Sequence, residues 1–214
     1  MPQIRKVLLI KEGIYAELIT EGAHFSRIKY VYGGVLYDIL VENDEFEIVE
    51  DGETFQANAL IKARAVFNVL NDPNAIVIAD DSGISIDVLN GAPGIYSARY
   101  AGEKATDKDN LEKVIQEVIK QGYKESRAFY TAAIAIVSQE GEKTVHGWMH
   151  GKVIIERHGD NGFGYDPIFI PEGYAKTLGE LNNEVKVNLS HRSKALNLAK
   201  ILIDQIKFMR LAWI

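Results

Sequence analysis

Two adjacent aspartates, Asp80 and Asp81, come directly after the apolar run NAIVIA, which ends at Ala79. Such a run is typical of a buried strand, whose successive residues point to opposite faces, so the two carboxylates cannot both face one core. We therefore place them at the end of the strand, where α/β sheets carry ligand-binding groups. Close carboxylates repel each other in a partly desolvated site unless a cation or a donor lies between them, and Mg²⁺ would meet that need. The alternative is a turn in which Asp81 and Ser82 bond nearby backbone N–H groups before Gly83.

The first fifty residues differ in pattern from the remainder of the chain. Residues 13–49 alternate apolar and polar side chains, are rich in β-forming residues and are interrupted by short polar or glycine-containing stretches. This pattern predicts a run of short antiparallel strands, with Gly33 and Gly34 in a hairpin turn.

Three later segments have the periodicity and the caps of helices. The first is expected to follow Thr54, the second carries a capping box made by Thr106 and Asp109, and the third starts at about Ser190. Strand patterns lie between them, at residues 84–88, 127–137, 143–150, 152–156 and 168–170. Because strands and helices mix without strict βαβ alternation, we predict an α/β fold with a mixed, twisted central sheet flanked by helices.

Charge and composition limit the classes of partner. The formal net charge of −6 gives no general attraction for nucleic acids or anionic membranes, so an anionic ligand would need local lysines or a divalent cation. No apolar run is long enough to cross a bilayer. The chain has no cysteine, which rules out disulfides and thiolate chemistry and fits a reducing compartment. We predict a cytoplasmic protein without nucleic-acid or membrane partners.

Two further motifs carry candidate ligand-binding residues. In NGFGYDP the glycines let the backbone approach a ligand, and Phe163 and Tyr165 could stack on a flat one; the alternative is a structured turn with both rings as core anchors. In LSHRSKA, Ser190 has the character of an N-cap, which places His191 and Arg192 in the first helical turn. Basic residues are unusual there, and this suggests that they donate hydrogen bonds to a ligand.

An acidic cluster precedes the first predicted helix. Glu50, Asp51 and Glu53 lie near the positive end of that helix, where carboxylates are favoured. Most such charges are solvated residues at a helix start. One of them could instead complete a metal site with Asp81, although the spacing alone does not select which.

Four ordered motifs together resemble the inosine triphosphate pyrophosphatase family, also called the non-canonical purine NTP or XTP/dITP pyrophosphatases. They are EDGETFQANALIKA, IADDSGISIDVLNGAPGIYSARYAGE, NGFGYDPIF and KVNLSHRSKAL, and they cover the chain from Glu50 nearly to its C-terminus. The resemblance implies a single domain over residues 1–214, an inosine triphosphatase-like fold with two lobes and a nucleotide cleft, and a homodimer.

The resemblance also implies roles for individual residues. Glu50 and Asp81 match the family's metal ligands, and Asp81 matches its catalytic activator of water. Residues implied to contact the substrate are Asn58, Lys62, Ser82, Phe163, Gly164, Tyr165, Asp166, Lys186, Ser190, His191 and Arg192.

The implied activity is the Mg²⁺-dependent hydrolysis of ITP, dITP and XTP to the monophosphate and pyrophosphate. Mg²⁺ would offset the repulsion between an acidic protein and a triphosphate. Asp81 would accept a proton from the attacking water, while His191 and Arg192 would donate to the 6-keto oxygen of hypoxanthine or xanthine. Adenine presents a donor at that position, so a buried donor would face a donor.

The N-terminal segment departs from the family pattern. Family members begin with a strand followed by an Asn-x-x-Lys phosphate loop; here KVLLI is followed by KEGIYAEL, and the strand-rich residues 13–49 replace the first helix. Lys6 or Lys11 could substitute for the missing lysine, and Ala57 stands where a Glu would complete a capping box. Two alternatives follow: a catalytically weak nucleotide-binding or regulatory homologue, and an enzyme for another nucleotide such as a modified pyrimidine triphosphate.

Overall fold

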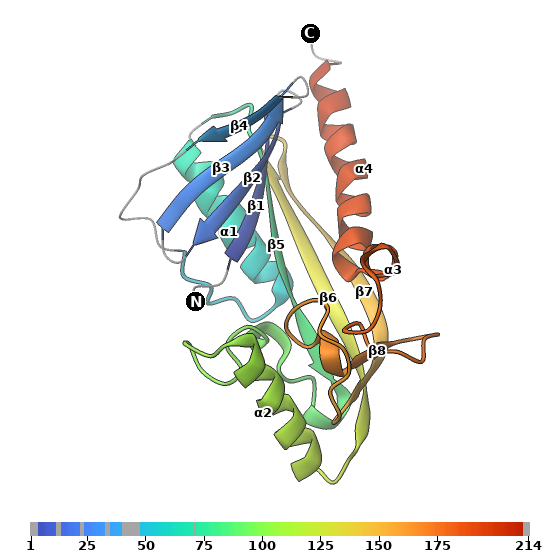
Figure 1. Cartoon of the computed structure of the whole chain (residues 1–214). Coiled ribbons are helices and arrows are strands. Elements are labelled where there is room, and N and C mark those ends of the chain that lie inside the picture. Colours follow the sequence, from blue (N-terminus) through green and yellow to red (C-terminus); the bar gives the residue numbers. More distant parts are fainter. Residues whose placement is uncertain are drawn as a thin grey trace. The chain divides into compact units, whose positions relative to one another are not determined.

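The computed structural model places most of the chain in strands and helices (Figure 1). It describes residues 4–11, 14–21, 24–32, 35–39, 48–70 and 72–211. The contacts between residues divide the chain into two compact units. Unit 1 holds residues 82–132 and 146–195, and unit 2 holds the described residues up to Asp81 together with 133–145 and 196–211. The predicted α/β class is confirmed.

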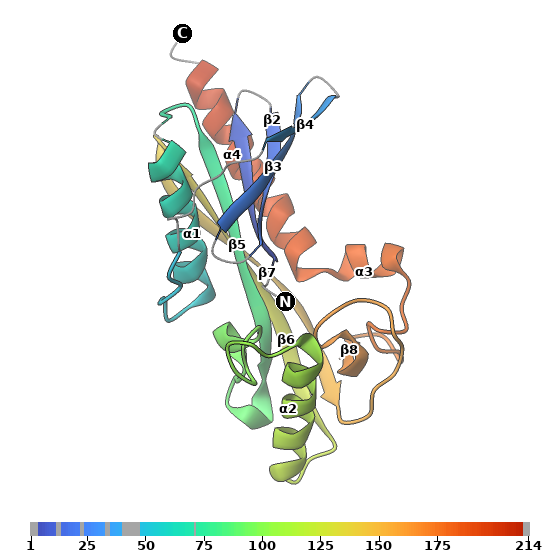
Figure 2. The same cartoon turned by 60° about the vertical axis from the view of Figure 1, so that its left-hand side comes forward.

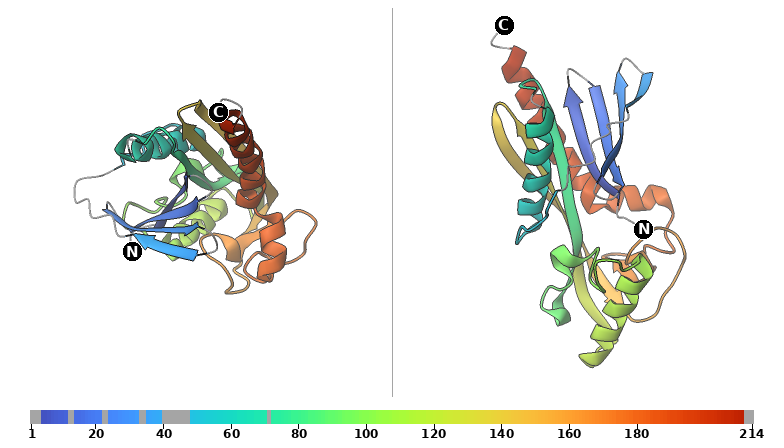
Figure 3. Two further views of the ribbon diagram at one scale, coloured as in Figure 1. Left: turned by 90° about the horizontal axis from the view of Figure 1, so that it is seen from above. Right: turned by 90° about the vertical axis from the view of Figure 1, so that its left-hand side faces the viewer.

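The N-terminal half of unit 2 is an antiparallel run of strands, seen in blue in Figure 3. Each strand pairs with the next one along the chain, and β1 also pairs antiparallel with β5, with Leu8 opposite Ile78. The strand order in this unit is β4-β3-β2-β1-β5-β6-β7. The antiparallel strands predicted here are confirmed, whereas the Gly33-Gly34 turn lies outside the described residues. The bounds are β1 Ile4–Lys11, β2 Ile14–Glu21, β3 His24–Tyr32, β4 Val35–Ile39 and β5 Ile76–Ile86.

Helix α1, Phe55–Leu70, lies alongside β5 in unit 2 (Figure 2). Thr54 begins it as predicted, because its Oγ1 accepts a hydrogen bond from the backbone N of Ala57 at 3.1 Å. Small side chains on its inner face, Ala59 and Ala63, allow the helix to approach the strand closely. The buried core of unit 2 consists of Ala59, Ala63, Val66, Val77, Ala79, Ala133, Ala135 and Val137.

Strand β5 corrects the predicted position of the aspartate pair. It runs without interruption from Ile76 to Ile86, so Asp80 and Asp81 lie in mid-strand and neither a strand end nor a turn is present at them. Gly83 lies within this strand, and a Cβ at this position would collide with the Ser97 side chain and with the backbone carbonyl of Gly94, both later in the chain. The absence of a side chain lets residues 94–97 pack directly against the strand.

Unit 1 contains the other end of the sheet, in the order β5-β6-β7-β8. The Thr106–Asp109 capping box is confirmed at the start of α2. Residues 143–156 were expected to form two strands, but one strand covers most of them, and a short helix, α3, was not predicted. The bounds are β6 Glu125–Ser138, β7 Gly141–Ile154, β8 Phe169–Pro171, α2 Asp107–Lys120, α3 Asn183–Leu189 and α4 His191–Leu211, the last of which continues into unit 2.

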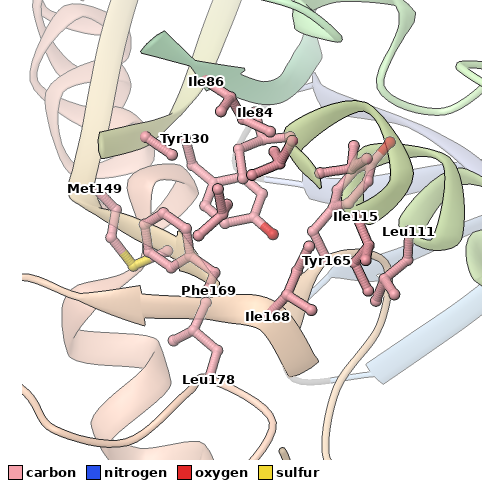
Figure 4. Packing of buried hydrophobic residues seen from close by; sticks show 14 residues of the cluster. Ile84, Ile86, Leu111, Ile115, Tyr130, Met149, Tyr165, Ile168, Phe169 and Leu178 are labelled. Atoms are coloured by element: carbon pink, nitrogen blue, oxygen red, sulfur yellow. The ribbon is translucent and has the colours of Figure 1, made fainter. Parts of the chain in front are cut away.

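The core of unit 1 is built around aromatic rings (Figure 4). The ring of Phe169 is fully buried and lies beside Met149 and Tyr130, with 4.8 Å between the Tyr130 and Phe169 ring centroids. Tyr165 joins the same core, and its hydroxyl donates to the backbone carbonyl of Ser97 at 2.6 Å. None of the helices in the described part of the chain is long and apolar enough to span a membrane.

We expect Gly83→Ala to destabilise the protein by about 1–3 kcal/mol, because the new methyl group overpacks a closed contact. Ser85→Ala in the same strand is the control, since it adds no atoms to a half-buried position, and we expect it to change stability by less than about 0.5 kcal/mol. Urea unfolding followed by circular dichroism measures both. Equal unfolding midpoints for the two variants would contradict the close contact at Gly83.

Candidate functional site

In unit 2, Lys62 joins two carboxylates. Its Nζ lies 3.0 Å from Asp81 Oδ1 and 3.4 Å from Glu50 Oε2. The three side chains are only 5%, 14% and 8% exposed, respectively. They come from three places in the chain: the segment before α1, α1 itself and β5. The packing of α1 on β5 through alanines is what brings the Lys62 side chain beside the strand.

Asn58, one turn before Lys62 on α1, completes this cluster. It is fully buried, and its Nδ2 donates to Asp81 Oδ2 at 3.3 Å. Its Oδ1 accepts from the backbone N of Gly52 at 2.9 Å, which ties the segment before the helix to the helix. Each carboxylate oxygen of Asp81 therefore receives a donor. The structure thus brings together Glu50, Asn58, Lys62 and Asp81, as expected for one site.

The charges of the cluster are not balanced. Two carboxylates face one ammonium group, and burial of the cluster raises the pKa of Asp81, while the charge and the hydrogen bond of Lys62 act in the opposite direction. A carboxylate that is partly stripped of water holds a proton more readily than one in solution. This property suits a group that must accept a proton.

The same cluster has the composition that a magnesium site requires. Mg²⁺ is commonly held by one or two protein carboxylates, with water and substrate phosphates supplying the other oxygens. Glu50 and Asp81 provide two buried carboxylates and a net negative charge, so they fit such an ion. Among the residues that the structure describes, no group of three or more His, Asp or Glu side chains is arranged to hold a metal alone. Asp51 and Glu53 are exposed and lie outside the cluster.

In unit 1, the two rings of NGFGYDP have different environments. Phe163 is 67% exposed, and the guanidinium of Arg192 lies over its ring, 5.9 Å from the centroid. Tyr165 is a buried core anchor, as the alternative interpretation of this motif predicted. Between them, the backbone N of Gly164 donates to Asp107 Oδ2 at 3.1 Å, which fixes the loop to the start of α2.

A buried ion pair supports this loop from the other side. Lys186 on α3 lies 2.7 Å from Asp166 Oδ2, and its Nζ also donates to the Asn161 carbonyl at 3.4 Å. Asp166 Oδ2 accepts from the backbone N of Phe163 at 3.4 Å. Burial raises the pKa of Asp166 and Lys186 opposes that effect. A side chain at Gly162 would collide with both partners, so this loop position requires glycine.

His191 is the first residue of α4 and packs inside unit 1. Its ring stacks on Tyr130 with 4.9 Å between centroids and an interplanar angle of 14°. Burial, together with the charges of Arg192 and Lys194, lowers the pKa of His191 to about 3. The imidazole is therefore neutral near pH 7, with one donor nitrogen and one acceptor. His191 does not add a positive charge to the helix start, although its basic character was part of the sequence argument.

One nitrogen of the His191 ring, Nδ1, lies buried without a hydrogen bond to the described part of the chain. Ser190, directly before it, acts as the predicted cap, with its Oγ accepting from the backbone N of Ser193 at 3.4 Å. Ser82 follows Asp81 in β5 and is half-buried. The predicted site residues are thus divided, with Glu50, Asn58, Lys62 and Asp81 in unit 2 and the others in unit 1.

Three supporting residues were not predicted from the sequence. Ser97 accepts the Tyr165 hydroxyl through its carbonyl, Asp107 holds Gly164, and Tyr130 stacks on His191. Asp107 could have been found, because an acidic residue in the first turn of a capped helix is a recognisable signal. The other two have no local signal, since their partners are distant in sequence.

Comparison with known proteins identifies relatives of the whole motif-bearing region. A family model described as the Ham1 family matches residues 23–201. A protein of Sulfurimonas denitrificans named dITP/XTP pyrophosphatase is 62% identical over 174 residues, which cover 79% of this chain and 86% of the relative. A protein of Campylobacter concisus with the same name is 48% identical and covers 89% and 98% of the two chains.

Solved structures of similar fold also include Ham1 proteins and a dITP/XTP pyrophosphatase. The Ham1 protein of Staphylococcus aureus has a TM-score of 0.69 and 39% sequence identity, covering 75% of this chain and 82% of that one. A structure from Mycobacterium abscessus, described as a nucleoside-triphosphatase and dITP/XTP pyrophosphatase, has a TM-score of 0.62 and 37% identity, with 73% and 82% covered.

The low pKa of His191 predicts a specific dependence of stability on pH. The unfolded chain binds a proton near the ordinary value of 6.5, and the folded protein only near 3, so acid favours unfolding. This stabilising contribution is complete above the unfolded pKa and is lost as the pH falls toward the folded one. We expect it to decrease by up to about 1.4 kcal/mol per pH unit between pH 6 and 4.

His191→Phe isolates this contribution, because it keeps a ring against Tyr130 but removes the titrating nitrogen. Urea unfolding of both proteins at several pH values measures the difference in free energy of unfolding, and the other titrating groups cancel. A difference that stays constant with pH would show that the imidazole titrates normally.

Proposed function

Because this chain belongs to the Ham1 family, we propose that it is a pyrophosphatase that hydrolyses the non-canonical purine nucleotides ITP, dITP and XTP to the monophosphate and pyrophosphate. Relatives that are 48% to 62% identical are named dITP/XTP pyrophosphatase, in agreement with the family predicted from the motifs. The observation that carries the proposal is the buried cluster in which Glu50 and Asp81 share Lys62. It combines a proton acceptor, a cation and two candidate metal ligands.

The proposed role of unit 2 is to act on the phosphates. Lys62 supplies a positive charge for the triphosphate in a protein whose net charge is −6. Magnesium bound by Glu50 and Asp81 would supply charge neutralisation and polarise the phosphorus. Asp81 accepts a proton from water as the water oxygen bonds to the α-phosphorus. The bond from that phosphorus to the bridging oxygen breaks, and pyrophosphate leaves.

The proposed role of unit 1 is to recognise the base. Phe163 offers an exposed ring on which a purine can stack. Arg192, held over that ring, carries only donors, which suit a 6-keto oxygen and oppose the amino group of adenine. Gly164, Tyr165 and Asp166 shape this loop, while Ser82, Lys186, Ser190 and His191 keep their predicted roles as substrate contacts.

Other parts of the assignment rest on the resemblance. We propose that residues 1–214 work as one functional domain, in a homodimer and in the cytoplasm. A catalytically weak nucleotide-binding homologue is the second candidate, because the family match begins at residue 23 and the Asn-x-x-Lys phosphate loop is absent. Calorimetry would separate the two functions: tight ITP binding without turnover favours the second, and rapid hydrolysis excludes it.

We expect Asp81→Asn to lower the rate of pyrophosphate release from ITP by about 10²–10⁴-fold, because the amide cannot accept the proton of water. The assay is run with Mg²⁺ and, separately, with a chelator, which should suppress turnover in the wild-type protein. Asp204→Asn, at an exposed position of α4, is the matched control and should retain full activity. Equal rates for the two variants would remove Asp81 from the mechanism.

We expect Phe163→Ala to raise the KM for ITP by about five- to a hundredfold, because stacking on an aromatic ring contributes about 1–3 kcal/mol per base. Phe208→Ala removes a similarly exposed ring, 73% exposed on α4, and should leave KM unchanged. Steady-state kinetics with ITP and ATP measure both variants. The assignment of Phe163 to the base fails if the two substitutions have the same effect on KM.

A further inference from the structure

Lys62 and a divalent ion would compete for the same carboxylates. We propose that Lys62 lowers the affinity of Glu50 and Asp81 for a divalent ion until a polyphosphate is present, so that metal and substrate bind cooperatively. The inference rests on the proposed function of this pair as metal ligands. Besides contacting a phosphate, Lys62 would couple the binding of the metal ion to the binding of the nucleotide.

The geometry supports direct competition. Lys62 Nζ donates to Asp81 Oδ1 at 3.0 Å and to Glu50 Oε2 at 3.4 Å. The second oxygen of Asp81 is engaged by Asn58 Nδ2 at 3.3 Å. A divalent ion held by both residues must therefore use an Asp81 oxygen that already accepts from the ammonium group or from the Asn58 amide. Sharing with Lys62 brings two cations close together.

Burial makes this repulsion effective. The Lys62 side chain is 5% exposed, and its partners are 14% and 8% exposed, so solvent screens their charges poorly. The residue lies on the inner side of α1, flanked by the buried Asn58 and Ala63. The ammonium group of Lys62 can leave the cluster only by giving up its contacts with both carboxylates. When a metal ion binds without a nucleotide, the positive charge of Lys62 therefore opposes it.

A polyphosphate changes this balance. An ammonium group has three donors, so Lys62 can bond to a phosphate oxygen while it remains in the cluster. The negative charges of the phosphates then offset both the ion and the lysine. Because the coupling between two ligands is reciprocal, the factor by which nucleotide tightens metal binding equals the factor by which metal tightens nucleotide binding. Lys62 thereby favours the complete complex over either partial one.

A purely structural role for Lys62 predicts a different result. If the lysine only holds the two carboxylates in position, its removal disorders them and weakens the binding of a divalent ion. If it competes with the ion, its removal strengthens binding. The sign of the change in metal affinity therefore separates the two roles.

The test measures Mn²⁺ binding by the electron paramagnetic resonance signal of free Mn²⁺, without nucleotide. We expect Lys62→Met to bind Mn²⁺ at least tenfold more tightly than the wild type, and Lys62→Arg, which keeps the charge, to bind within about threefold of it. Lys152→Met is the matched control, because it removes a lysine from an exposed ion pair with Glu125 at 2.7 Å. Its affinity should equal that of the wild type.

A second measurement tests the coupling itself. Calorimetry with a non-hydrolysable α,β-imido analogue of ITP gives nucleotide affinity with and without Mn²⁺. The wild-type ratio should be at least tenfold larger than the ratio for Lys62→Met. If that variant does not fold without metal, Lys62→Gln takes its place, and the rise in melting temperature on adding Mn²⁺ should exceed the wild-type rise.

The outcomes separate this inference from the proposed function. In one outcome, the uncharged Lys62 variants bind Mn²⁺ as the wild type does or more weakly, and Asp81→Asn does not bind it. This result overturns only the coupling role of Lys62. Equal Mn²⁺ binding by wild type and Asp81→Asn shows that the carboxylate pair is not the metal site, and the proposed function then loses its carrying observation. Tighter binding by Lys62→Met together with a smaller nucleotide effect supports the inference.

Discussion

The contact of Lys62 with two buried carboxylates is the interaction on which unit 2 depends. It connects the segment before α1, the helix itself and β5 through atoms that lie 3.0 to 3.4 Å apart. Burying a charge without a partner is costly, so each of the three groups stabilises the buried position of the others. The alanines of α1 make the arrangement possible, because only small side chains let the helix bring Lys62 and Asn58 to the strand. The packing residues and the buried polar cluster therefore share one surface of one helix.

In unit 1, a glycine-containing loop carries the exposed ring of Phe163. The loop is anchored on one side by Tyr165, whose hydroxyl bonds the Ser97 carbonyl, and on the other by the ion pair of Asp166 and Lys186. Asp107 fixes the backbone between the anchors. These contacts hold the backbone of the loop, while the Phe163 ring itself stays exposed. The same loop thus contains a core residue and a surface residue two positions apart.

The sequence predicted the local features well and the tertiary ones only through the family motifs. Thr54, the Thr106 capping box and the start of α4 were found because caps are encoded by neighbouring residues. The strand end expected at Asp80 was wrong, because the apolar run stops at Ala79 but the strand continues to Ile86. The alternative of a turn before Gly83 was also wrong, since Gly83 lets another segment approach the strand. No periodicity could have shown that.

In the candidate site, too, the sequence predicted which residues belong together but not the contacts that depend on tertiary packing. The motifs named Glu50, Asn58, Lys62 and Asp81, and the structure places them in contact, but the bridging position of Lys62 depends on helix packing and was not foreseen. Residues such as Tyr130 and Ser97 act through partners far along the chain, so their roles could not be predicted from spacing.

The stack of His191 on Tyr130 has a consequence for how the protein responds to its surroundings. A ring that remains uncharged down to a pKa of about 3 offers the same donor and acceptor in neutral and mildly acidic conditions. The hydrogen-bonding character of this ring is therefore constant across that pH range. Burial beside an aromatic ring thus gives a histidine, a residue that commonly responds to protons, a hydrogen-bonding pattern that mild acid does not change.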